Sequence, residues 1–125
     1  MQNTLSQPKP GESYLLWLIK IISGVLIFAV LIIHFLVNHL LAPNGLLSHA
    51  EVVAYYRNYP IVPIMEGFFL VFVVSHSLIG SRSIILDLRP SPALLKVLDY
   101  LFIALGLFAT GYGIWLLFAV INFGL

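Results

Sequence analysis

The last part of the chain carries no charged side chain. From Tyr100 to Leu125 the sequence has no Asp, Glu, Lys or Arg, and this run exceeds the roughly 20 apolar residues that a helix needs to cross a bilayer. Of all 125 residues, 61% are hydrophobic and 9% are charged, whereas a soluble domain usually has about 25% charged residues. These proportions exclude a soluble globule and predict an all-α membrane protein.

Two more apolar segments precede this one, so we expect three transmembrane helices. The predicted spans cover about 14–41, 61–88 and 94–121. They belong to an anchor domain of residues 14–125, which follows a polar segment, 1–13, that contains prolines and a glycine. This composition predicts a mobile cytoplasmic tail.

A segment between the first two spans has the chemistry of a helix start. Ser48 is followed three residues later by Glu51, which is the spacing of a capping box. Tyr55 and Tyr56 come next, and aromatic side chains of this kind favour the headgroup region of a membrane. We therefore predict a short interfacial helix at about 48–58, which either anchors the chain in the interface or forms a lid over a cofactor.

The basic residues gather on one side of the predicted spans. That side holds Lys9, Lys20, Arg82, Arg89 and Lys96. Because basic residues stay preferentially on the cytoplasmic side, the N-terminus is expected in the cytoplasm and the C-terminus outside. The N-terminal segment lacks the Arg-rich amphipathic pattern of a transit peptide, which favours the cytoplasmic (inner) membrane of a prokaryote.

Charge and cysteine content narrow the function classes further. A net charge of +1 gives no clustered basic surface, so no nucleic-acid partner is expected. The chain has no cysteine, which excludes a covalently attached c-type haem and an iron–sulphur cluster ligated by this chain.

Three histidines fall inside the predicted spans or near their ends: His34, His39 and His76. An ionisable side chain at membrane depth is costly and is a functional hypothesis by default. Imidazole ligates haem iron or another metal, relays protons, or hydrogen-bonds a neighbouring helix. At 1.5 Å per residue, His34 and His76 should differ in depth by about 12 Å, too much for both to ligate one iron. As haem ligands they would serve two haems, each with a second ligand from a partner subunit.

Charged residues near the cytoplasmic boundary have two interpretations. Arg82 and Lys20 lie where haem propionates would find cations, or they simply follow the positive-inside bias. Asp87 lies further inward along the second span, where a carboxylate orients a quinone, delivers protons or pairs with Arg89.

The second span carries a motif that resembles a known family. His76 is followed four residues later by Gly80 and eleven residues later by Asp87. This pattern resembles the small cytochrome b membrane anchor subunit of succinate dehydrogenase and fumarate reductase. One departure is Leu88, because the family usually has there a tyrosine that contacts the quinone.

The resemblance implies a fold, cofactors and partners. The chain would form half of a two-subunit helical bundle that binds haem b, with one or two haems, and a quinone. Its partners would be a second membrane anchor subunit, an iron–sulphur subunit and a flavoprotein subunit, within the lipid bilayer. Ser23-Gly24 followed by His34 also resembles the first helix of anchors from two-haem enzymes.

The same resemblance assigns roles to single residues. These are haem ligation by His76 and His34, with His39 as the alternative, propionate contacts from Arg82 and Lys20, and quinone contacts from Asp87 and Ser23. Electrons would pass from the iron–sulphur subunit to quinone, and only the assembled complex would be an enzyme.

Two rival functions stay open. One is a haem-free structural anchor of the same enzyme, in which the histidines only hydrogen-bond. The other is a small proton-coupled transporter or assembly protein, in which His76 and Asp87 relay protons.

Overall fold

The described part of the chain is helical nearly throughout. The computed structural model describes residues 8–36, 40 and 47–125. Its helices are α1 (Tyr14–Phe35), α2 (His49–Asn58), α3 (Ile61–Asp87) and α4 (Pro92–Phe123). Of these, α1, α3 and α4 are long and apolar enough to cross a membrane. The predicted all-α membrane fold with three spans and a short fourth helix is confirmed.

Serine side chains begin three of the helices. Ser13 accepts a hydrogen bond from the Leu16 amide at the start of α1, and Ser91 caps α4 with Pro92 directly after it. Ser48 and Glu51 form the predicted capping box at the start of α2. Each cap satisfies amide groups that have no partner inside the helix.

The helix ends depart slightly from the sequence ranges. The described part of α1 ends at Phe35, and most of 36–41, which the first span was predicted to include, lies outside the described residues. At the end of α3, Arg89 has a φ of 50°, a left-handed conformation that stops a helix. The last helix runs from Pro92 to Phe123, longer at both ends than the predicted 94–121.

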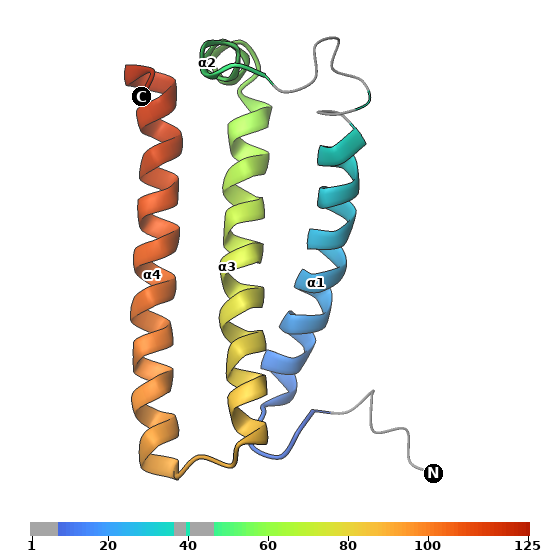
Figure 1. Cartoon of the computed structure of the whole chain (residues 1–125), viewed down its shortest axis with the longest axis vertical. Coiled ribbons are helices and arrows are strands. Elements are labelled where there is room, and N and C mark those ends of the chain that lie inside the picture. Colours follow the sequence, from blue (N-terminus) through green and yellow to red (C-terminus); the bar gives the residue numbers. More distant parts are fainter. Residues whose placement is uncertain (1–7, 37–39, 41–46) are drawn as a thin grey trace.

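The spanning helices form one layer, with α3 in the middle (Figure 1). Helix α3 packs against α1 on one side and α4 on the other, while the backbones of α1 and α4 do not approach each other within the described ranges. Helix α2 lies across the end where the C-terminus is, against α3 and α4 (Figure 1). We call this the α2 end, and the opposite end, where α1 begins and α3 meets α4, the N-terminal end.

A single layer leaves its apolar residues uncovered. Among the described hydrophobic residues, only Val53 and Ala119 are buried, whereas large side chains along all three spans are exposed. Lipid or another membrane protein must cover them. Two glycines of α4 let it approach α3 closely: a Cβ on Gly106 would lie 2.9 Å from Leu78 Cδ1, and one on Gly113 would lie closer still to Leu70 Cδ2. Small residues at such contacts let membrane helices pack closely.

Candidate functional site

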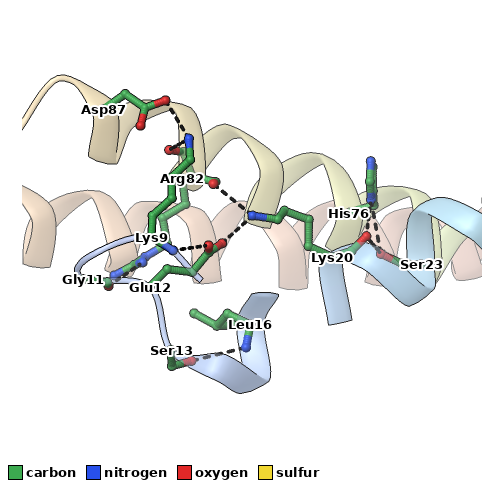
Figure 2. A network of polar contacts seen from close by, with 11 residues as sticks. Lys9, Gly11, Glu12, Ser13, Leu16, Lys20, Ser23, His76, Arg82 and Asp87 are labelled. Carbon is green, nitrogen blue, oxygen red and sulfur yellow. Dashed lines mark hydrogen bonds and ion pairs between the residues drawn. The ribbon is translucent and has the colours of Figure 1, made fainter. Parts of the chain in front are cut away.

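His76 makes the main polar contact between α3 and α1. Its Nδ1 lies 3.0 Å from the backbone oxygen of Lys20 and 3.2 Å from Ser23 Oγ. Because a carbonyl oxygen only accepts, the Lys20 contact requires the ring hydrogen on Nδ1. In a neutral ring the other nitrogen, Nε2, then keeps its lone pair, and the ring extends away from Lys20 and Ser23 (Figure 2). This is the tautomer with which a neutral histidine ligates a metal through Nε2.

Two glycines shape the surroundings of His76. A Cβ on Gly24 would lie 2.9 Å from His76 Cε1, so the imidazole fits against α1 only because Gly24 has no side chain. Gly80 lies one turn after His76 on a neighbouring part of the same helix face. A Cβ on Gly80 would meet no atom within 4 Å, so packing within the described chain does not require a glycine there.

His34 lies on the same helix as Gly24 but at another level. The two residues are ten positions apart, which is about 15 Å along a helix axis, in place of the 12 Å that the predicted span centres gave. The side chain of His34 is exposed. His39 lies outside the described residues. His34 and His76 therefore do not converge on one point in this chain, and their ligand roles stay predictions.

Lys20 has a buried carboxylate partner that the sequence did not point to. Its Nζ lies 2.6 Å from Glu12 Oε1 and 3.0 Å from Ser83 Oγ. The side chains of Lys20 and Glu12 are 17% and 2% exposed. Residues 8–13 therefore pack against α1 and α3 (Figure 2), while 1–7 of the predicted tail lie outside the described residues.

The Glu12 carboxyl is held in its charged form. Burial raises its pKa, but hydrogen bonds from Lys20 and from the Lys9 amide, with the charge of Lys20, outweigh burial. The pKa of Glu12 therefore lies below its ordinary value, and the group is a carboxylate at neutral pH.

Asp87 is an exposed partner of the same segment. Its Oδ2 lies 2.6 Å from Lys9 Nζ, and the two side chains are 58% and 42% exposed. Lys9 Nζ also lies 3.4 Å from the backbone oxygen of Ser83. The ion pair of Asp87 is thus formed with Lys9 and not with Arg89, the partner considered from the sequence.

Arg82 is engaged by the last helix. Its Nε and Nη2 donate to the two oxygens of Asp99 at 2.6 Å and 3.1 Å, a bidentate pair that joins α3 to α4. Nη1 also lies 3.4 Å from the backbone oxygen of Gly11. Both cations predicted for haem propionates, Arg82 and Lys20, therefore already pair with carboxylates of this chain.

Glu12 and Asp99 were both missed from the sequence, for different reasons. Arg82 and Asp99 lie equally far from the turn at Pro90 and Ser91. Antiparallel helices joined by a short turn place such residues at one level, so this pair was open to prediction. No comparable pattern marks Glu12, which lies among prolines and polar residues before the first span.

The family can now be assigned. The model of the succinate dehydrogenase/fumarate reductase transmembrane subunit family matches residues 2–113. The chain belongs to this family. It is therefore a multi-pass membrane protein and a subunit of a larger enzyme complex, with a catalytic role only as part of that complex. Neither the search of curated proteins nor the search of solved structures found a match.

The match to the succinate dehydrogenase/fumarate reductase family covers the polar contacts described above. The matched range includes His34, His76 and the ion pairs of the N-terminal end, and it stops inside α4. The transporter or assembly protein considered from the sequence has no support from this match.

Proposed function

We propose that this subunit binds haem b through His76, in a site completed by a second membrane anchor subunit, and helps to form the quinone site. Electrons from an iron–sulphur subunit would reach the quinone there, after succinate oxidation on a flavoprotein subunit. The observation that carries the proposal is the contact between His76 Nδ1 and the Lys20 carbonyl at 3.0 Å.

This contact supports ligation because it fixes both the proton and the ring plane. Ligating histidines usually donate their second ring N–H to a carbonyl or carboxylate, which orients the ring and raises the basicity of the ligating nitrogen. Gly24 gives the imidazole room against α1, and Gly80 leaves open space beside it. Bound haem would supply one-electron redox chemistry. The chain's own part is to hold Nε2 in a fixed direction.

A second haem would use His34, with His39 as the alternative ligand. The roughly 15 Å rise from Gly24 to His34 supports two levels in the membrane. Each haem then takes its second axial ligand from the partner anchor subunit. The uncovered apolar faces of the helix layer are consistent with such a partner, because they need lipid or protein against them.

The polar groups of the N-terminal end are assigned to propionates and quinone. Lys20 and Arg82 would contact propionates in competition with Glu12 and Asp99, their partners in this chain. Ser23, next to His76, and Asp87, at the exposed edge, are proposed quinone contacts. We place this end in the cytoplasm of a prokaryote, because it holds most of the basic residues.

Haem content of the assembled complex tests the proposal. His76→Leu should remove one haem b, seen as a smaller α-band in the reduced-minus-oxidised spectrum of the purified complex. His49→Leu is the matched control, because His49 lies in α2, where its ring contacts the Leu125 oxygen at 2.8 Å. Retained haem in a fully assembled His76→Leu complex would refute the ligand assignment.

The second candidate is a haem-free anchor of the same complex. One observation favours it, namely that Lys20 and Arg82 already have carboxylate partners. In that case the His76 contact with Lys20 only joins two helices. A wild-type complex that reduces quinone with succinate but has no b-type α-band would establish this candidate instead.

A further inference from the structure

Glu12 lies two contacts away from the proposed haem ligand. Its carboxylate binds Lys20 Nζ at 2.6 Å, and the backbone oxygen of Lys20 accepts from His76 Nδ1 at 3.0 Å. Ser23, one helical turn after Lys20, also contacts His76 and bonds the same carbonyl at 3.1 Å. One turn of α1 therefore contacts both residues. The Lys20 side chain binds Glu12, and the Lys20 backbone oxygen accepts from His76.

The direction of the Lys20 side chain follows from its partners. Its ammonium group points to the N-terminal end, away from His76 (Figure 2), where Glu12 Oε1 and Ser83 Oγ lie 2.6 Å and 3.0 Å away. A flexible lysine without these partners has several rotamers available, some of which bring the charge toward the level of His76. Ser83 is an uncharged partner, so Glu12 supplies the ionic part of the attraction.

Helix formation alone does not account for Glu12. Ser13 already caps α1. Glu12 is among the few buried polar residues of the described chain, and withdrawing the charges of an ion pair from water is unfavourable. An ion pair retained in such a place is a candidate for setting geometry as well as stability.

We propose that Glu12 is a positioning residue of the His76 site. It holds the Lys20 ammonium against Ser83. This contact fixes the turn of α1 that His76 contacts, and it keeps the lysine charge at the N-terminal end. The effect of Glu12 on haem rests on the proposed function, whereas the contact by which Glu12 fixes the Lys20 ammonium does not.

Lysine labelling tests the hold on Lys20 without any need for haem. Membranes that contain the assembled complex are treated with a small amine-reactive reagent, and labelling of Lys20 is measured by mass spectrometry relative to exposed Lys96. Glu12→Gln should raise Lys20 labelling several-fold. Glu51→Gln is the matched control, since Glu51 lies in the capping box of α2, and it should leave the labelling ratio unchanged. An unchanged ratio in Glu12→Gln overturns the proposal.

The haem spectrum of the same samples tests the link to His76. Glu12→Gln removes a negative charge, so the midpoint potential of the haem on His76 should rise, because reduced haem carries less positive charge. The low-spin haem signal should also shift as the imidazole loses its fixed orientation. Raised labelling with an unchanged potential and haem signal also overturns the proposal.

Two further outcomes keep the tests separate. If Glu12→Gln does not assemble, Glu12→Asp, which keeps the charge on a shorter side chain, should give Lys20 labelling and a haem potential above the wild-type values. Wild-type values in both would overturn the proposal. If the wild-type complex has no haem, the proposed function fails, while labelling still decides whether Glu12 holds Lys20.

Discussion

At the N-terminal end of the bundle, Lys9, Lys20 and Arg82 each pair with a carboxylate from another segment, whereas at the α2 end Arg57 meets a backbone carbonyl. Arg82 pairs with Asp99, and Glu12 with Lys20. At the α2 end, Arg57 Nε donates to the Ile121 oxygen at 2.7 Å. The last carbonyls of a helix have no partner within it, so a nearby cation stabilises them wherever the helix ends.

The comparison separates a contact that a helix end needs from ion pairs that the helix ends do not need. The contacts of the α2 end satisfy groups that any helix C-terminus leaves open. At the N-terminal end, Ser13 and Ser91 already cap α1 and α4, so the ion pairs are not needed to cap these two helices. They fix charges at set positions on the N-terminal side of His76, the residue for which we propose haem ligation.

The largest effect on the proposed site is expected from Gly24→Ala. The new Cβ would lie 2.9 Å from His76 Cε1, so the imidazole or the helix must shift, at a cost of about 1–3 kcal/mol. The haem assigned to His76 should be lost or change its spectrum. Gly111→Ala is the matched control, because a Cβ there meets nothing within 4 Å. Equal haem spectra in both variants would show that His76 is not a closely held ligand.

A smaller effect is expected from Arg82→Ala. This change leaves Asp99 without its bidentate partner, and we expect a loss of about 1–2 kcal/mol, since both side chains are partly exposed. Thermal inactivation of the complex measures the loss. The double variant Arg82→Ala/Asp99→Ala should recover part of it, because no unpaired carboxylate remains. A double variant less stable than the single one would argue against the pair.

The smallest effect is expected at the α2 end, from Arg57→Ala. It removes a hydrogen bond to one exposed carbonyl, worth about 0.5–1.5 kcal/mol. The haem spectrum and the Lys20 labelling should stay as in the wild type, since Arg57 contacts Ile121 near the C-terminus. A shift of the haem spectrum comparable with that of Gly24→Ala would abolish the distinction between the two ends.

The sequence predicted the fold better than it predicted the polar contacts. Long apolar runs leave no alternative to membrane helices, and the Ser48 capping box is a local signal that the structure confirms. The Arg82–Asp99 pair needed a non-local argument, the equal distance of both residues from the turn. The contact of Lys20 with Glu12 depends on how a segment without regular structure packs, which neither periodicity nor composition encodes.

The candidate site was predictable only as a set of residue types. His76 stood out because polar side chains are rare in an apolar span, and its spacing to Gly80 and Asp87 matched the family pattern. That Lys20 offers its carbonyl, rather than its ammonium, to His76 required coordinates. A backbone group has no sequence signature.

The central position of α3 bears on how the sequence can change over evolution. This helix contacts α1, α2 and α4, while the backbones of α1 and α4 do not approach each other within the described residues. A substitution on α1 is therefore compensated in α3 or in another protein, whereas one on α3 needs matching changes on two sides. Related subunits should accordingly drift faster along their first and last spans than along the middle one, with the slowest change on the two opposite faces of α3.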